Sequence, residues 1–479
     1  MKKSKRLTIN AGLNVIKQLF TILFPLITFP YASRVLGVEN YGKINFGSSI
    51  ISYFSLLAGL GIYNYGIREG ARVKDNTVKL YNLANEIFSI NLISTMVSYI
   101  LLIILLIFNV KLKGYVALLL IQGSAIIFTT IGIDWFNVIF EDYLFITVRY
   151  IICQIASVIC MLLFVREEGD YLQYALASVL SSIIANISNV LYIKKKYSYF
   201  PKFVFNVNYK KHLASIMIMF SSAIATLIYI NSDVTILGVL KDDAVVGLYS
   251  VSAKIYTLIK QLLNALLVVA IPRISNEIAR KEFEVADEHY NKIFSYLILI
   301  LGPACTGLFI LSENIIELFC GVEYLQATNS LKILVIALFF ATMACFFVNV
   351  VMIPNRMEKY VLRSTVLSAM VNIVLNLLLI PNLGQNAAAL TTVIAELIML
   401  ISGIYYTRKV LSLHFNNSIL LSIISSIAVF IICLISRRSF KNNILTIVVS
   451  IVCSGVFWSI CIVGGKYYKT WYDNLTSHS

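Results

Sequence analysis

Charged residues are scarce in this chain of 479 residues. Asp, Glu, Lys and Arg make up 13% of the chain, about half of the roughly 25% found in soluble globular domains. Hydrophobic residues supply 59% of it, and the mean hydropathy is +0.83. A soluble fold is excluded by this composition, because too few polar groups are present to cover its surface. Lipid is therefore expected to be the solvent for most of the molecule.

Motifs of common catalytic and metal sites are also missing. There is no Gly-rich ATP loop of the form G-x-x-x-x-G-K-[ST], no H-E-x-x-H zinc motif and no nucleophile elbow. None of the eight cysteines forms a C-x-x-C pair, and the four histidines are too dispersed to predict a metal site. We therefore expect no metal, no cofactor and no enzyme activity. If the chain is a transporter, an ion gradient, a substrate gradient or a partner must drive it.

The chain instead contains many long apolar segments. About fourteen recur along the chain, each near the roughly 20 residues that a helix needs to cross a bilayer. They are too long and too uniformly apolar for barrel strands, which alternate over about 10 residues. The sequence thus predicts an all-α polytopic membrane protein. The expected spans are 10–33, 43–66, 84–108, 115–139, 144–165, 171–193, 213–240, 247–271, 292–312, 331–353, 361–380, 387–407, 417–435 and 444–465.

The charges between the spans predict the orientation of the chain. With the N-terminus inside, the cytoplasmic loops are rich in Lys and Arg, for example Lys194, Lys195 and Lys196, whereas the outer loops collect acids such as Glu167 and Glu168. This distribution is the positive-inside bias. It places both termini in the cytoplasm and accounts for the net charge of +15 without a nucleic-acid partner. The longest inner loops, 67–83, 194–212 and 272–291, are too short to be folded domains, so the function is expected within the helix bundle.

A weak internal repeat divides the chain. Gly42 and Arg68 bracket the second span, and Gly247 and Arg273 bracket the eighth at the same separation, 205 residues later. Six spans separate the copies, and this even number keeps both copies in the same orientation. The halves should then be related by an axis along the membrane normal. The expected parts are an N-terminal lobe (1–212, helices 1–6), a C-terminal lobe (213–416, helices 7–12) and two extra helices with a cytoplasmic tail (417–479).

Polar residues interrupt the matching spans 1, 2, 7 and 8. Residues three and four apart share one face of a helix, and the polar side chains of these four spans fall on such stripes. A central polar cavity between two lobes is the economical arrangement. For the uncharged residues, hydrogen bonds that join helices are an equally good alternative. The predicted polar lining of the cavity is Asn14, Lys17, Thr21, Asn45, Thr226, Thr257, Gln261 and Asn264.

Charges within spans are costly and usually face a bundle interior or water. Lys254, Lys260 and Asp233 are therefore assigned to the cavity, although a salt bridge between Lys254 and Asp233 is an alternative. Lys17 could instead extend to the inner interface, and Arg34 and Arg273 lie at span ends, where topology alone could explain them. The candidate sites for a coupling ion are Asp233, Glu86, Asp134 and Glu396. A salt bridge or an interface position remains open for Glu86, Asp134 and Glu396.

Several stretches carry a family resemblance across nearly the whole chain. They are Pro25 to Gly37, Tyr41-Gly42, Tyr65 to Arg72, Asp134-Trp135-Phe136 with Glu141 and Ile146 to Arg149, Asn372 to Gly384, and Ala387-Ala388 with Glu396. In these stretches the chain resembles Wzx-type polysaccharide repeat-unit flippases of the multidrug/oligosaccharidyl-lipid/polysaccharide exporter superfamily. The resemblance implies two pseudo-symmetric six-helix lobes with two C-terminal helices, and transport by alternating access. It also implies a place in the bacterial cytoplasmic membrane and a role in O-antigen, capsule or exopolysaccharide biosynthesis.

The implied cargo is an oligosaccharide linked to undecaprenyl pyrophosphate, with a polysaccharide polymerase and a chain-length regulator as possible partners. A diphosphate is strongly anionic, so the substrate-binding cations are expected to be Lys254, Lys260, Arg273, Arg34 and Arg68. A drug or cation exporter of the same superfamily is a rival, but the cationic eighth span argues against it. A lipid II flippase and a membrane polymerase or ligase are the other rivals. The last would need a sizeable outer loop, which this chain lacks.

Overall fold

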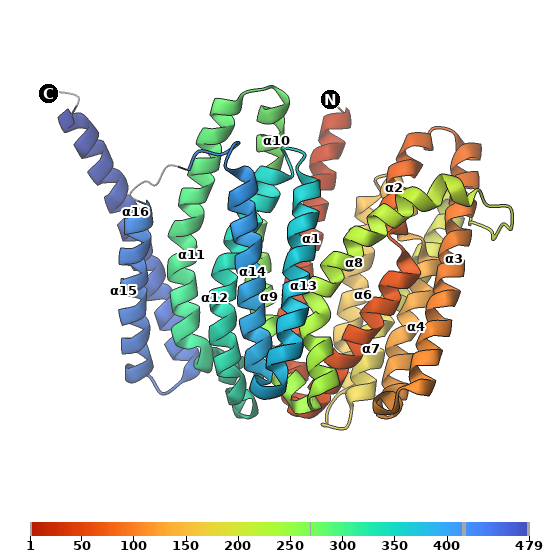
Figure 1. Ribbon diagram of the computed structural model, residues 1–479, viewed down its shortest axis with the longest axis horizontal. Coiled ribbons are helices and arrows are strands. Elements are labelled where there is room, and N and C mark those ends of the chain that lie inside the picture. Colours follow the sequence, from red (N-terminus) through yellow and green to blue (C-terminus); the bar gives the residue numbers. More distant parts are fainter. Residues whose placement is uncertain (1, 269, 414–417, 477–479) are drawn as a thin grey trace. The chain divides into compact units, whose positions relative to one another are not determined.

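The computed structural model describes residues 2–268, 270–413 and 418–476, without the side chains of residues 2–11, 14 and 462–476. Within these residues every regular element is helical (Figure 1). In this described part of the chain, thirteen helices are long and apolar enough to cross a membrane. The first of these spans covers Val15–Val73, 59 residues, and is broken by a non-helical Gly37, so it accounts for two crossings. The predicted all-α architecture with about fourteen spans is confirmed.

The chain divides into two compact units, Met1–Gly247 and Leu248–Ser479. The first contains α1 (Lys2–Gly59), α2 (Ile62–Val73), α3 (Thr77–Phe108), η1 (Val110–Tyr115), α4 (Val116–Gly132), α5 (Asp134–Ile139), α6 (Tyr143–Phe164), α7 (Tyr171–Tyr197), α8 (Tyr209–Leu240) and the start of α9 (Asp243–Val268). Within this unit α1 packs against α3, α4, α6 and α8, and α7 packs against α4 and α6. The predicted lobe boundaries remain a prediction.

The second unit contains the rest of α9 and the elements that follow it. These are α10 (Ile271–Ala279), α11 (Phe283–Cys320), η2 (Val322–Ala327), α12 (Thr328–Cys345), a π-helical turn η3 (Phe346–Met352), α13 (Glu358–Leu383), α14 (Gln385–Thr407), α15 (Ser418–Ser439) and α16 (Asn443–Thr476). Here α14 packs against α12 and α13, while α11 packs against α12, α15 and α16. The two C-terminal helices therefore lie against α11.

Two of the segments expected as inner loops are largely helical, which corrects the interpretation of 67–83 and 272–291. The first segment holds the end of α2 and the start of α3, and the second holds α10 and the start of α11. In α2 the apolar face with Ile62 and Tyr65 is buried, while Arg68 and Arg72 are exposed. A helix with one polar face interrupts an apolar run without interrupting helical structure. Hydropathy therefore places the end of the span too early.

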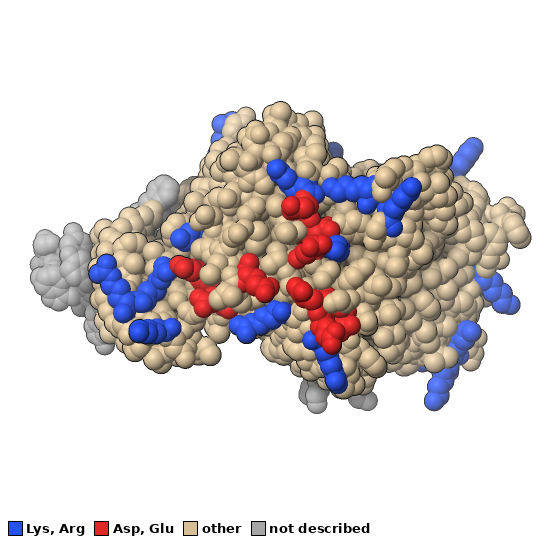
Figure 2. All heavy atoms as spheres, turned by 90° about the horizontal axis from the view of Figure 1, so that it is seen from below, with Lys and Arg blue, Asp and Glu red and all other residues tan. Residues whose placement is uncertain are grey.

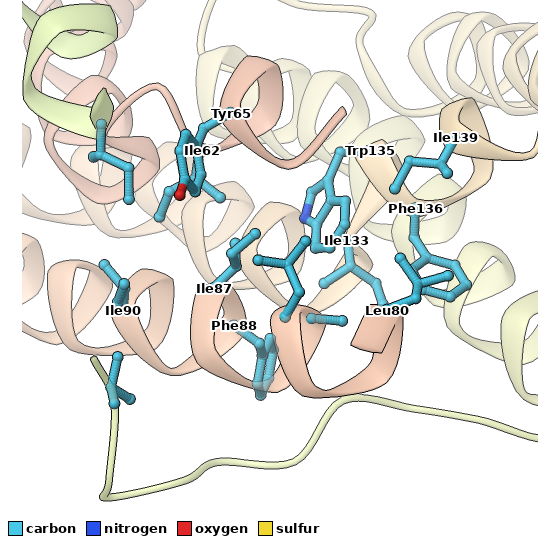
Figure 3. Close-up of a cluster of buried hydrophobic side chains, with 14 of the residues drawn as sticks. Ile62, Tyr65, Leu80, Ile87, Phe88, Ile90, Ile133, Trp135, Phe136 and Ile139 are labelled. Carbon is cyan, nitrogen blue, oxygen red and sulfur yellow. The ribbon is translucent and has the colours of Figure 1, made fainter. Parts of the chain in front are cut away.

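The first unit has a buried core where α2, α3 and α5 meet (Figure 3). α5 is a six-residue helix that follows Ile133, whose positive φ of 43° ends α4. Its Trp135 and Phe136 are 3% and 0% exposed and pack with Ile87 of α3 and Tyr65 of α2. This cluster fixes α2 to the neighbouring helices, so the polar residues on α2 have defined positions.

The end of the helices opposite the N-terminus of α1 holds a close glycine contact. A Cβ atom at Gly42 of α1 would collide with the carbonyl oxygen of Asp243, and a Cβ atom at Gly247 would collide with that of Val38. Asp243 follows Val38 by 205 residues, the same offset as between the glycines. Figure 2, which views this end, shows acidic and basic side chains beside one another.

Candidate functional site

A charged pair lies within the second unit, between α9 and α14. Lys260 Nζ lies 2.6 Å from Glu396 Oε1, and the side chains are 21% and 5% exposed. Tyr256, one turn before Lys260, donates its O–H to the same carboxylate oxygen at 2.8 Å, and Lys260 donates to the tyrosine oxygen at 3.2 Å. The carboxylate thus receives two donors from one face of α9. A buried carboxylate that accepts from two donors on one helix is typical of a fixed structural pair.

Lys254 lies on the same helix, six residues before Lys260. Its side chain is partly buried, and among the described residues no ion pair or hydrogen bond to its ammonium is found. Thr257 and Gln261 are exposed on α9, and Asn264 is partly buried with an amide oxygen that has no described hydrogen-bond partner. This face of α9 therefore combines an uncompensated cation with amide and hydroxyl groups. It can bind an anion together with a ligand rich in hydroxyls.

Arg273 is engaged elsewhere. It lies on α10, where its Nε is 3.2 Å from Glu277 Oε1, and its side chain is 69% exposed. His289 of α11 contacts the same carboxylate at 2.9 Å through Nδ1. Glu277 is 10% exposed by its side chain and ties α10 to α11. The structure records no contact that would join Arg273 to Lys254 or Lys260 in one cluster of described residues.

The predicted cations of the first unit lie at separate places. Arg68 of α2 pairs with Glu69 at 2.9 Å and lies over the ring of Tyr65, with 5.6 Å from its Cζ to the ring centroid. Arg34 is exposed on α1 near the Gly37 break. Lys17 lies 5.8 Å above the ring centroid of Tyr150. These side chains do not form one cationic cluster in the structure.

Three of the predicted uncharged lining residues bond within their own helices. The Thr21 hydroxyl donates to the Lys17 carbonyl at 2.9 Å, and the Thr226 hydroxyl donates to that of Ser222 at 3.1 Å. The Asn45 amide donates to the Tyr41 carbonyl at 2.7 Å. Both threonines are nonetheless exposed, and each hydroxyl keeps acceptor capacity for a ligand. The side chain of Asn14 lies outside the described residues.

The four predicted ion-coupling acids lie in different surroundings. Asp134 pairs with Arg149 of α6, with 2.5 Å between Oδ1 and the guanidinium, whose side chain is 7% exposed. Asp233 of α8 is 5% exposed. Glu396 belongs to the Lys260 pair. Glu86 of α3 is the acid that contacts a histidine, His212 of α8, at 2.8 Å. The structure thus distributes these acids over separate helix contacts.

His212 is a buried residue that sequence reasoning missed. Its side chain is 0% exposed and is bonded at both ring nitrogens, to the Tyr65 hydroxyl at 2.7 Å and to Glu86 at 2.8 Å. The two partners precede it by 147 and 126 residues. The one local signal in the sequence was a histidine at the polar start of an apolar run. Such a pattern does not predict which side chains the histidine contacts.

Two of the cavities among the described residues, one in each unit, have linings that bear on the site. The second unit has an apolar cavity of about 470 Å³ between α9, α11, α15 and α16, with Pro303, Ala304, Val429 and Trp458 among its lining residues. The first unit has a smaller cavity of about 250 Å³, with Asn91, Thr129, Thr130 and Asp134 in its wall. The large cavity suits an acyl or isoprenoid chain by its composition, and the small one suits a polar group.

A protein-family model described as "Polysaccharide biosynthesis protein" matches residues 7–278. The chain is also similar to a protein named "Putative O-antigen transporter" from Escherichia coli (strain K12), with 20% identity over 354 residues that cover 74% of this chain and 85% of the relative. The Shigella dysenteriae protein of the same name is 22% identical over 362 residues, which cover 74% of this chain and 87% of the relative.

Solved structures of membrane transporters have the same fold. The lipid II flippase MurJ in an inward closed conformation matches with a TM-score of 0.74 and 16% identity over 95% of this chain and 99% of that one. An inward-facing multidrug resistance MATE family transporter of the MOP superfamily matches with a TM-score of 0.57 and 14% identity, over 82% and 97%. At these identities the likeness shows the fold alone.

Proposed function

This chain belongs to the polysaccharide biosynthesis protein family, and we propose that it is a flippase for a lipid-linked oligosaccharide. The resemblance predicted from the sequence motifs is confirmed by the family match and by the two O-antigen transporter relatives. The chain is a multi-pass membrane transporter of the polysaccharide type. The proposed cargo is an oligosaccharide on undecaprenyl pyrophosphate, carried from the cytoplasmic to the outer leaflet of the bacterial cytoplasmic membrane by alternating access.

The observation that carries this proposal is the difference between Lys254 and the other predicted cations. Lys260, Arg273 and Arg68 each contact a carboxylate, whereas Lys254 has no described acid partner. An ammonium in a membrane-spanning helix is costly to insert unless it is paired or meets water or a ligand. A diphosphate is the anionic part of the proposed cargo, and lysine binds phosphate as a point charge. Lys254 is therefore the proposed diphosphate ligand.

The second unit also offers groups that suit the sugars and the lipid tail of the proposed cargo. Sugar hydroxyls need donors and acceptors, which Thr257, Gln261 and Asn264 supply on α9. The lipid tail needs an apolar surface, and the cavity of about 470 Å³ in the second unit offers one within a membrane-spanning part of the chain. The tail can remain in such a groove while the headgroup crosses. A polymerase and a chain-length regulator are proposed as partners that use the product.

The family match favours this cargo over its rivals. A lipid II flippase shares the fold, but the sequence relatives carry the name of O-antigen transporters rather than of lipid II flippases. A drug exporter would favour an acidic site, whereas α9 presents Lys254. An enzyme would need a catalytic constellation, and transport by the helix bundle requires none. The cytoplasmic location of both termini is part of the proposal and follows from the loop charges.

The direct test is flipping of a labelled lipid-linked oligosaccharide by the purified full-length protein in vesicles, with lipid II and a cationic drug as competing cargoes. Loss of a charge-assisted hydrogen bond costs on the order of 1.5–3 kcal/mol, so Lys254→Ala should weaken cargo binding roughly tenfold or more. Lys254→Arg should keep part of the activity because it keeps the charge. Lys332→Ala is the matched control, since Lys332 is another partly buried lysine, placed over the Phe309 ring.

Two results would contradict the assignment. Flipping by Lys254→Ala at the rate of the unaltered protein would remove Lys254 from the site. Restored flipping when Lys254→Ala is combined with Asp233→Ala would mean that the lysine serves a structural ion pair. Transport of the drug but not of the glycolipid would overturn the proposed cargo itself.

A further inference from the structure

The first turn of α8 is attached to two other helices through one histidine. His212 is the fourth residue of α8, and its side chain is fully buried. Tyr65 of α2 and Glu86 of α3 contact its two ring nitrogens at 2.7 Å and 2.8 Å. Tyr65 also meets the histidine ring edge-on, with 5.7 Å between centroids, and belongs to the core around Trp135 shown in Figure 3. Three titratable side chains from three helices thus form one continuous hydrogen-bonded chain.

The chemistry of Glu86 and Tyr65 determines which ring nitrogen of His212 carries hydrogen. A carboxylate only accepts, so Glu86 must receive the N–H of His212 Nε2. The Nδ1 atom of neutral His212 then has a lone pair, which accepts the Tyr65 O–H. A further proton can enter at Nδ1, provided that Tyr65 rotates its O–H away and accepts instead. The protonated imidazole would then donate from both nitrogens, and its contact with Glu86 would become an ion pair.

Other charged groups surround this chain and influence the added proton. Glu69 and Glu86 bring negative charge to this region, while Arg68, Lys210, Lys211 and the amino-terminal end of α8 bring positive charge. The titratable groups of the packed elements include Tyr63, Tyr65, Arg68, Glu69 and Arg72 on α2, Lys79, Tyr81 and Glu86 on α3, Tyr199 and Lys202 before α8, and Tyr209, Lys210 and Lys211 on α8. Glu69 is already engaged by Arg68 and Arg72, which leaves Glu86 as the acid in direct contact.

We infer that Glu86, His212 and Tyr65 form a proton-binding site that controls how tightly the start of α8 is docked on α2 and α3. A bound proton replaces a neutral hydrogen bond with a charge-assisted one, which is roughly twice as strong. Docking should therefore be tighter at acidic pH. The Glu86 side chain is 23% exposed, so the carboxylate that accepts from the imidazole is within reach of water. Resting on the proposed function, the inference names the proton as the coupling ion.

Two of the other candidate acids contact cations rather than a histidine. Asp134 pairs with Arg149, and Glu396 pairs with Lys260. His289 also contacts an acid, Glu277, but that carboxylate is shared with Arg273 and joins the adjacent helices α10 and α11. The His212 chain differs because it joins helices that are far apart in the sequence. His289 therefore serves as the matched control.

Hydrogen exchange at the start of α8 tests the proton site without any cargo. The full-length protein in lipid nanodiscs is measured between about pH 5.5 and pH 8, with intrinsic exchange rates divided out, on peptides that cover residues 209–220. Protection should increase at acidic pH by on the order of tenfold, the gain from neutral to charged hydrogen bonding. His212→Gln should abolish this response, Tyr65→Phe should reduce it, and His289→Gln should preserve it.

Either of two exchange results would overturn the site: protection that does not depend on pH in the unaltered protein, or a response that persists in His212→Gln. Should His212→Gln fail to fold, Tyr65→Phe decides, because it leaves the histidine and Glu86 in place and removes one hydroxyl. An unchanged response in Tyr65→Phe would then refute the chain.

Vesicle assays with imposed proton gradients test the coupling. Flipping of the labelled glycolipid should respond to an inward or outward proton gradient, and the response should be lost in His212→Gln but kept in His289→Gln. Flipping that ignores the gradient, with exchange still dependent on pH, would overturn the coupling and leave the proposed function standing. Absence of any flipping by the unaltered protein would instead refute the proposed function, while the exchange result still decides the proton site.

Discussion

The Lys260–Glu396 pair offers the sharpest test of which intramembrane charges are structural. The relevant variants are Glu396→Gln, Lys260→Met and the double variant. Glutamine keeps the shape of the carboxylate and can still accept the Tyr256 O–H, and methionine keeps the length of the lysine stem without its charge. Each single variant removes one charge and leaves the other in place, 2.6 Å from where its partner was.

The expected magnitude follows from burial. Breaking a buried ion pair typically costs about 3–5 kcal/mol, because one charge is left without compensation. Glu396 is 5% exposed and Lys260 is 21% exposed, so a lone Glu396 is harder to solvate than a lone Lys260. We expect Lys260→Met to lower the free energy of unfolding by about 4 kcal/mol and Glu396→Gln by about 3 kcal/mol. The double variant should lie within about 1 kcal/mol of the unaltered protein, since no buried charge remains.

A double-mutant cycle on the full-length protein in micelles measures these differences through equilibrium unfolding. The two side chains should show a coupling energy of several kcal/mol, and Tyr256→Phe should cost less than either charge variant. A coupling energy under about 0.5 kcal/mol would refute this account. Lys260 would then be available to an anionic cargo, as the sequence pattern proposed, and Glu396 would return to the candidates for ion coupling.

Three further predictions concern packing and the cavity. Gly42→Leu should destabilise the protein by about 1–3 kcal/mol or more, because the new side chain meets the Asp243 backbone, and thermal unfolding should show a lower midpoint. Asp134→Asn should cost about 2 kcal/mol, reduced by the 38% exposure of its side chain, and unfolding of Asp134→Asn with Arg149→Met should return toward the original stability. Ala304→Phe should slow flipping of a long-tailed glycolipid more than of a short-tailed one in the vesicle assay, because phenylalanine partly fills the apolar cavity.

Much of the fold could be predicted because the bilayer demands long apolar helices. The breaks within and between helices were harder, since they depend on single residues. Ile133, with a φ of 43°, interrupts helical structure inside the expected span 115–139. Gly37, with a φ of 67°, lies between the expected spans 10–33 and 43–66, and helical structure continues on both sides of it. Conversely, Arg68 and Arg72 lower the hydropathy of α2 without ending its helix. Apolarity indicates where lipid lies, whereas backbone dihedrals and polar faces decide where a helix begins and ends.

The partners of the charged residues could not be predicted, because each pair is made by tertiary packing. Lys260 and Glu396 are 136 residues apart, and His212 lies 126 residues from Glu86. Sequence periodicity placed Lys254 and Lys260 on one helix and could not distinguish them. The structure separates them through α14, which brings an acid to Lys260, while no described acid meets Lys254.

Residues of the internal repeat lie in close contact in the structure. An offset of 205 residues relates Gly42 to Gly247 and Val38 to Asp243. The contacts are reciprocal, because each glycine meets the carbonyl oxygen of the residue four positions before the other glycine. Small residues permit such close backbone approach within a membrane. A larger side chain at either glycine should disturb the same contact, and similar substitutions at the two positions should produce similar losses of stability.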